Sequence, residues 1–198
     1  MKVLTNKIQT EIIVKNSRFI NELFVCDSQS QARDIIKAQK EKYQDASHVC
    51  HAFVIGKEAE VLGMSDAGEP SGTAGRPMLD VLKGSGITNI LLTVTRYFGG
   101  TLLGTGGLVK AYGDSAKSAI EKAISENATE ELVEKKEFSF SCDYSTYEVI
   151  KRQLKDFTIY EIKEEYSDNV TLKAKILADE FETFSARIKN LSNGKICL

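Results

Sequence analysis

Short runs of alternating or β-branched apolar residues in the first half of the chain are typical of β-strands. The runs lie at residues 11–15, 18–26, 49–55, 60–65 and 87–98. The last of them, ITNILLTVTRYF, is the richest in β-branched and aromatic residues, which favour strands. Asn16-Ser17 separates the first two runs, and we expect the turn of a β-hairpin there.

Three other segments of this half carry apolar residues at the spacing of an amphipathic α-helix. They are 28–43, about 74–83 and about 106–126. Asp27-Ser28 is placed to cap the first helix, because short polar side chains accept hydrogen bonds from the first N–H groups of a helix. The second and third helices each follow a glycine-rich loop.

The charged segment 127–138, NATEELVEKKEF, is poor in apolar residues and is the predicted boundary between two domains, 1–132 and 136–198. Beyond it the pattern of strands and helices starts again. The predicted elements are a strand at 136–144, a helix at 145–156 capped by Ser145, strands at 158–166 and 170–177, a helix at 179–194 ending at Gly194, and a last strand at 195–198. This βαββαβ order is the ferredoxin-like arrangement, so the chain is expected to be α+β.

Composition and charge exclude several classes of protein for this chain. The 198 residues are 42% hydrophobic and 27% charged, values of an ordinary soluble globular protein. The longest apolar runs span about five residues, far short of a membrane span. The N-terminus carries no apolar signal segment, so a cytoplasmic location is expected. The net charge of −2 argues against non-specific wrapping of nucleic acid, although a local basic patch is compatible with it. The four cysteines have no paired spacing and are expected to be buried thiols.

Glycines concentrate between Gly63 and Gly113, where 12 of the 14 occur together with both prolines. Two glycine-rich loops, 68–75 and 99–107, each lead into a predicted helix. Backbone N–H groups at the start of a helix attract anions. The nucleotide-binding motifs do not fit, because the sequence lacks GxxxxGK[ST] and the Rossmann glycine spacing. The pattern therefore indicates an anion-binding surface but no particular nucleotide.

The candidate binding residues for RNA or another anion lie in and beside these loops. They are Arg76, Arg96, Tyr97, Gly99, Gly100, Gly104, Gly106, Gly107 and Lys110. Arg96 and Tyr97 end the central strand, where a cation and an aromatic ring can contact a phosphate and a base. Arg76 and Lys110 are expected in the first turns of two helices, where a bound anion would offset their unfavourable place in the helix dipole. The alternative is structural: Arg96 pairs with Asp66, and Tyr97 belongs to the core.

A second candidate group, made of His48, Asp66, Glu69 and Thr73, would form a polar or metal-binding rim beside the first loop. The alternative is that the loop carboxylates serve the backbone by closing turns and capping the helix. His48 and His51 are three residues apart on a predicted strand, so they point to opposite faces and cannot share one metal ion. A metal is left undetermined, no cofactor is expected, and no catalytic residue is assigned.

The stretches SDAGEPSGTAGRPMLDVL and TVTRYFGGTLLGTGGLVKAYGDSA closely resemble the signature of the IMPACT family. The resemblance covers residues 17–126, and the C-terminal pattern agrees with the second domain of the bacterial members. The positions that match the family are His48, Asp66, Glu69, Pro70, Gly72, Thr73, Gly75, Pro77, Arg96, Gly99, Gly100, Leu103, Gly104, Gly107 and Lys110.

The resemblance also implies folds for both domains. The first is expected to look like the second domain of small-subunit ribosomal protein five, with a left-handed βαβ crossover that is also found in domain IV of elongation factor G. The second domain is expected to be ferredoxin-like, similar to the C-terminal end of elongation factor G. Eukaryotic relatives regulate translation through a general-control kinase and carry an extra N-terminal interaction domain, and that pathway role is not carried over.

Together these features favour a cytosolic, non-catalytic factor that binds RNA or the ribosome, with a protein of translation as a further partner. Replacing Arg96 and Lys110 by alanine is then expected to weaken RNA binding and leave the melting temperature nearly unchanged. One alternative is an enzyme or receptor for a small phosphate-bearing ligand held over the glycine loops. Another is a protein-interaction module in which the glycines only allow tight packing. The sequence does not specify an oligomeric state.

Overall fold

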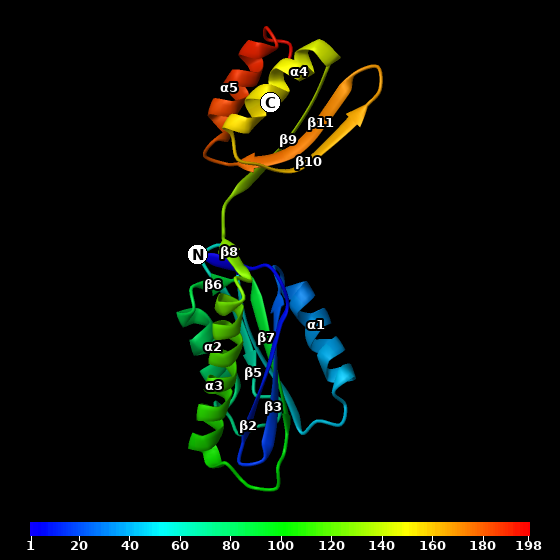
Figure 1. Ribbon diagram of the computed structural model, residues 1–198. Coiled ribbons are helices and arrows are strands. Elements are labelled where there is room, and N and C mark those ends of the chain that lie inside the picture. The colour runs from blue at the N-terminus through cyan, green and yellow to red at the C-terminus, as the bar shows by residue number, and fades with distance from the viewer. The chain divides into compact units, whose positions relative to one another are not determined.

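The computed structural model describes residues 1–198, which form two compact units, Met1–Leu132 and Val133–Leu198 (Figure 1). Each unit combines helices with its own β-sheet, so the chain is α+β. Each unit also has its own cluster of buried apolar side chains. None of the helices is both long and apolar enough to cross a membrane.

The first unit is built on a five-stranded sheet in the order β2-β3-β7-β4-β5, with all neighbours antiparallel. Its strands are β2 (Ile8–Val14), β3 (Ser17–Val25), β4 (His48–Ile55), β5 (Val61–Ser65) and β7 (Ile90–Tyr97). The turn between β2 and β3 contains Lys15 and Asn16 at positive φ. Two consecutive residues at positive φ match the right-handed twist of a two-residue hairpin.

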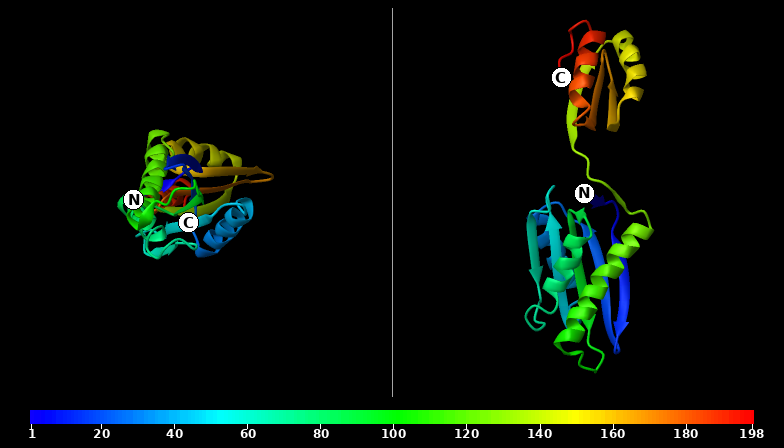
Figure 2. Two further views of the ribbon diagram at one scale, coloured as in Figure 1. Left: turned by 90° about the horizontal axis from the view of Figure 1, so that it is seen from below. Right: turned by 90° about the vertical axis from the view of Figure 1, so that its left-hand side faces the viewer.

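Helices cover the two faces of this sheet unequally. They are α1 (Gln29–Lys42), α2 (Gly75–Gly84) and α3 (Gly104–Ser125). Figure 1 shows α2 and α3 on one face and α1 on the other, and the views of Figure 2 agree. Ser28 caps α1 by accepting a hydrogen bond from the Gln31 N–H, as the sequence predicts.

The run at 87–98 forms two strands instead of the single strand that its composition predicts. They are β6 (Ile87–Thr88) and β7, separated by Asn89 at a φ of 55°. The Asn89 carbonyl accepts from Cys26 N–H and its side chain from Gly56 N–H, so the break has its own hydrogen bonds. β6 joins a small second sheet in the order β6-β1-β8, with β1 (Lys2–Leu4) in the centre and β8 (Thr129–Glu131) at the other edge.

The second unit contains a three-stranded antiparallel sheet in the order β10-β11-β9. Its elements are β9 (Lys135–Cys142), α4 (Tyr144–Gln153), a 3-10 turn (Leu154–Asp156), β10 (Ile159–Tyr166), β11 (Val170–Leu177) and α5 (Phe181–Leu191). The observed order is βαββα, so the predicted last strand is wrong. Ser192 accepts hydrogen bonds from the N–H groups of Lys195 and Ile196, which turns the backbone away from an extended path.

The predicted cap of α4 is also wrong. Asp143, two residues before Ser145, accepts from the Thr146 N–H and serves as the cap. A carboxylate is as good an N-cap as a serine hydroxyl, and it adds a favourable charge at the positive end of the helix dipole.

Candidate functional site

A pocket of about 540 Å³ lies where the glycine-rich loops meet the ends of the central strands. Its polar lining comes from His48 on β4, Glu69 in the first loop, Arg96 on β7 and the first residues of α3. Its apolar walls are Pro70, Phe98, Leu102, Leu103 and Leu108. We call this the glycine-loop pocket.

The base of the pocket holds a buried ion pair between Arg96 and Glu69. Arg96 Nη1 donates to Glu69 Oε1 at 2.8 Å, and both side chains are at least nine-tenths buried. The Tyr112 hydroxyl, on α3, donates to the same oxygen at 2.7 Å. The Arg96 guanidinium also lies against the rings of Phe19 and Phe98. The proposed pairing of Arg96 with Asp66 is therefore wrong, because Glu69 is the partner.

Arg96 keeps unused hydrogen-bonding capacity at the pocket. Its Nε is buried and has no acceptor. A buried donor without a partner costs free energy comparable to a lost hydrogen bond.

His48 faces the same pocket. Its Nδ1 lies 3.0 Å from the Ala67 carbonyl oxygen, and because a carbonyl only accepts, Nδ1 carries the hydrogen. Nε2 lies 3.9 Å from Glu69 Oε2. His51 lines a separate pocket beside α1, on the opposite face of the sheet, as the alternation of strand side chains predicts.

Asp66 serves the backbone of the first glycine loop. One carboxylate oxygen accepts from Gly72 N–H and the other from the N–H groups of Ala74 and Gly75, at 2.8 to 2.9 Å. Burial raises the pKa of this carboxyl, but these three hydrogen bonds outweigh burial and lower it. The start of α2 is therefore already occupied by a carboxylate, and the anion expected there has no place. Thr73 is buried and donates to the Pro70 carbonyl, which holds the same loop.

The start of α3 is different, because no side chain caps it. Gly104 and Thr105 begin the helix and line the pocket. The exposed residues Gly104 and Gly106 provide no Cβ, and one added there would meet nothing within 4 Å. The first N–H groups of this long helix therefore have no hydrogen-bond acceptor from a side chain, and they lie beside Arg96. Free N–H groups at a helix N-terminus bind anions.

Gly99 has a structural role in the second loop. A Cβ on Gly99 would lie 2.0 Å from the Asn16 carbonyl carbon and 2.3 Å from the Ser17 nitrogen, so only glycine lets this loop pack on the β2–β3 turn. Gly100 faces open space at positive φ, and Gly107 lies inside α3.

Of the predicted site residues only His48, Glu69, Arg96 and Gly104 line the pocket. Three charged or aromatic side chains among the others have different partners. Tyr97 follows Arg96 on the strand, so it points to the opposite face and donates to Asp45. Arg76 and Lys110 are exposed, and each pairs with an aspartate one helical turn on. Lys110 also lies in the second turn of α3 rather than the first, because the helix begins at Gly104.

The network beneath the pocket includes Cys50 and Tyr112. The Cys50 thiol donates to the Asp66 carbonyl at 3.0 Å and lies 3.4 Å from the Tyr112 hydroxyl oxygen. Burial raises the pKa of Cys50 to about 12 and also raises the pKa of Tyr112. Both groups stay protonated at neutral pH and act as hydrogen-bonding core residues. The apolar spacing of residues 106–126 predicts that Tyr112 faces inward, as it does in α3, but no sequence pattern shows that it meets Glu69.

No group of three or more His, Cys, Asp or Glu side chains is arranged to hold a metal ion. The polar rim expected from His48, Asp66, Glu69 and Thr73 is divided instead. His48 and Glu69 line the pocket, whereas Asp66 and Thr73 bond to the backbone of the loop.

Comparisons with known proteins place the chain in a family. Residues 15–120 match the Impact N-terminal domain, and residues 140–195 match a domain of unknown function, DUF1949. The IMPACT family member YigZ of Escherichia coli is 37% identical over 187 residues, which cover 93% of this chain and 90% of that protein. The chain belongs to the IMPACT family. Within the family, YvyE of Bacillus subtilis is 38% identical over 190 residues, covering 93% of this chain and 83% of that protein.

Two solved structures are similar to the chain to different degrees. A crystal structure of a hypothetical protein is 35% identical and covers 98% of this chain and 93% of its own, with a TM-score of 0.70. The structure of the two-domain translational regulator Yih1 covers 61% of this chain and 46% of its own at 23% identity, with a TM-score of 0.36. The resemblance to the IMPACT family expected from the two signature stretches is confirmed. The structure joins those stretches directly, since Glu69 comes from one of them and Arg96 and Tyr112 from the other.

Proposed function

We propose that this protein is a non-catalytic factor of translation that binds RNA, with one backbone phosphate held at the start of α3 in the glycine-loop pocket. The observation that carries the proposal is the uncapped N-terminus of α3 beside Arg96. A 22-residue helix places about half a positive elementary charge at this end. Because Glu69 already pairs with the Arg96 charge, the phosphate would be bound mainly by the exposed backbone N–H groups at the start of α3.

Exposed apolar side chains at the rim support RNA rather than a free anion. Phe98 is 48% exposed and Leu102 is 82% exposed, and both line the pocket. An exposed aromatic ring next to a phosphate site can stack on a nucleotide base, which is how proteins bind single strands without reading their sequence.

The fold expected from the family resemblance also supports a role in RNA binding. The proposal keeps the expectation that the first unit resembles the second domain of small-subunit ribosomal protein five and that the second unit belongs to the ferredoxin-like group. Fold alone does not assign a function, so RNA binding is inferred from the glycine-loop pocket.

The test is the affinity of the full-length protein for a fluorescent single-stranded RNA of about 12 nucleotides at roughly 0.1 M salt. Gly106→Glu places a carboxylate in the first turn of α3, where it stabilises the helix and takes the place of the phosphate. Gly113→Glu makes the same change in the middle of α3, where an added Cβ also meets nothing. We expect the first variant to bind RNA at least about 10-fold more weakly and the second to bind like the wild type.

The control for general charge effects is the salt dependence. A single phosphate contact predicts a slope of about −0.7 in a plot of log affinity against log salt. Absence of binding to RNA and to ribosomes at low salt contradicts the proposal. Equal loss of binding in both glutamate variants contradicts the assigned position.

A second candidate function is a receptor for a small phosphorylated molecule. The pocket volume of about 540 Å³ and the five apolar wall residues favour it, because small-ligand pockets are of this size and mostly apolar. A thermal-shift screen of phosphorylated metabolites distinguishes the two. A small ligand that raises the melting temperature of the wild type but not of Gly106→Glu would favour the receptor.

A further inference from the structure

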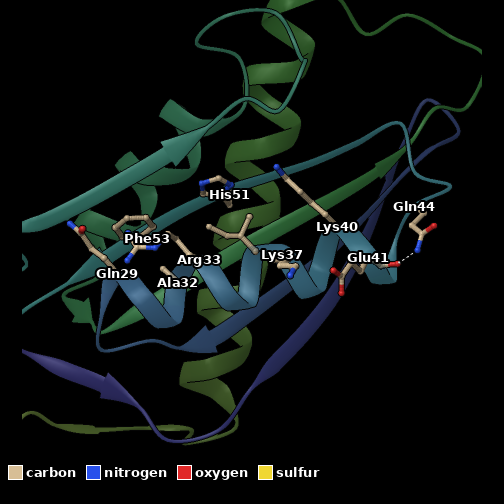
Figure 3. A pocket seen from close by; sticks show the side chains of 10 residues that line it. Gln29, Ala32, Arg33, Lys37, Lys40, Glu41, Gln44, His51 and Phe53 are labelled. Atoms are coloured by element: carbon tan, nitrogen blue, oxygen red, sulfur yellow. Dashed lines mark hydrogen bonds between the residues drawn. The ribbon is translucent and has the colours of Figure 1, made fainter.

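A second pocket, of about 700 Å³, follows the whole length of α1 on the other face of the sheet. Its lining runs from Gln29 to Glu41 along the helix, a distance of about 18 Å at 1.5 Å per residue, and ends at Gln44 beyond it. His51 and Phe53 of β4 form the opposite side, and Figure 3 shows them beside the helix. We call this the α1 groove.

One helix is too narrow to cover this face of the sheet. Neighbouring strands lie about 4.8 Å apart, and a helix with its side chains is about 10 Å wide, so one helix covers about two strands. Two helices, α2 and α3, cover the other face of the same five strands. Here α1 packs on β4 and β7, so on the side toward the sheet edge the single strand β5 carries no helix of this chain. The groove lies along this boundary, between α1 and the edge strand.

The floor of the groove is apolar and level. Ala32 and Ile36 of α1 line it together with Phe53. A Cβ on Gly63 would lie 2.1 Å from the Phe53 ring, which shows that the ring lies directly on the β5 backbone. Since Gly63 and Phe53 are paired in the sheet, no side chain of β5 rises above the ring at this point.

The rim of the groove is positively charged along α1. Arg33, Lys37 and Lys40 are exposed and make no ion pair, and Glu41 is the only carboxylate in the lining. These cations are spaced at three and four residues, so they form a row along one side of the groove. The chain as a whole has a net charge of −2, so this row is a local excess of positive charge.

His51 adds an unused hydrogen-bond partner to the wall. Its Nδ1 is buried and unpaired. Burial, and secondarily the charge of Lys40, lower the pKa of His51 to about 4, so the ring is neutral at physiological pH.

We propose that the α1 groove is a docking site for an acidic amphipathic helix of a partner protein. Such a helix would lie along α1 over Phe53, with its apolar stripe on the floor and its carboxylates against Arg33, Lys37 and Lys40. Helices that dock in this way present apolar residues at i, i+3, i+4 and i+7. The row of cations distributed along the groove fits a chain of carboxylates better than a ligand with a single anionic group. The proposal is independent of RNA binding at the glycine-loop pocket.

The experiment uses full-length ¹⁵N-labelled protein and a synthetic peptide of about 16 residues, long enough to follow α1, with a leucine stripe flanked by glutamates. A matched peptide carries lysine in place of every glutamate. We expect the acidic peptide to shift the amide signals of α1 and of His51 and Phe53, and the basic peptide to shift none of them. The affinity should fall at least about 10-fold in the triple variant R33E/K37E/K40E.

The control variant R152E/K155E/K195E changes the net charge equally at exposed positions of the second unit and should bind like the wild type. If the triple variant does not fold, the milder K37A/K40A variant replaces it, with a smaller loss of affinity expected. Equal binding of both peptides, or shifts elsewhere on the molecule, overturns the proposal. It is also overturned if the groove signals respond instead to single-stranded RNA, to vesicles of anionic lipid, or to self-association of the protein.

Discussion

At the scale of single residues, Asp66 and Glu69 show how two carboxylates in one loop take different roles. Asp66 accepts three backbone N–H groups and caps α2. Glu69 is turned into the pocket, where it meets Arg96 and Tyr112. The first is a structural group and the second belongs to the candidate site, although only two residues separate them in the sequence.

Asp66 should make stability depend on pH below about 4. Its pKa is lowered from 3.8 in the folded state, so its contribution is fully present above that value and is lost as pH falls through the lower pKa of the folded protein. Asp66→Asn should lower the free energy of unfolding by about 1–2 kcal/mol at pH 7 and flatten this acid dependence. Urea unfolding at a series of pH values measures both effects. Asp80→Asn, at an exposed ion pair, is the control and should change stability by less than about 0.5 kcal/mol.

Gly99→Ala should destabilise the first unit by about 1–3 kcal/mol, because the new methyl group meets the backbone of the β2–β3 turn. Gly113→Ala, inside α3 with free space around it, should instead stabilise by up to about 1 kcal/mol. Thermal unfolding of the two variants compares them directly. A stability of Gly99→Ala equal to that of the wild type would show that the loop does not pack as described.

Because Arg96 is buried in an ion pair, an alanine variant at this position is a poor test of RNA binding. The sequence predicts that replacing Arg96 and Lys110 by alanine leaves the melting temperature nearly unchanged, and the buried position of Arg96 argues against this. Removing it would leave the Glu69 carboxylate buried without its partner, a change that typically costs about 3–5 kcal/mol. This is why the RNA-binding test uses Gly106 in place of Arg96.

At the scale of elements, long runs with a clear period were predictable and short strands were not. The helices and the five strands of the large sheet follow from apolar spacing and lie within a few residues of their predicted ranges. β1, β6 and β8 are two or three residues long, too short to show a period, and they form only because distant segments pair. The partner of Arg96 could not be predicted either, since a loop with several glycines has no path that its sequence determines. The opposite directions of Arg96 and Tyr97, in contrast, follow from strand alternation alone.

Replacing Leu4 is expected to weaken the small sheet β6-β1-β8 more than the rest of the first unit. This residue is 3% exposed and ends the central strand β1. Leu4→Ala should cost about 2–5 kcal/mol and speed amide hydrogen exchange in β6 and β8. Thr5→Ala, at an exposed neighbouring position, is the control. Unchanged exchange in β8 would argue against this pairing.

At the scale of the whole molecule, the two units have separate cores. Phe184 is fully buried in the second and packs on Phe138 with ring centroids 4.7 Å apart. Phe184→Ala should therefore destabilise the second unit by about 3–5 kcal/mol and accelerate amide exchange in β9 and β11. Exchange in β7 of the first unit should not change. Faster exchange in both units would show that they unfold together.

The central claim, that the start of α3 beside Arg96 receives a phosphate, is tested most directly by NMR of the full-length protein with single-stranded RNA. We predict that RNA shifts the backbone amide signals of Gly104, Thr105 and Gly106, while the amides of Gly75 and Arg76 at the capped start of α2 stay in place. Inorganic phosphate should shift the same α3 signals more weakly. RNA-induced shifts that avoid α3, or that appear equally at the starts of both helices, would contradict the account.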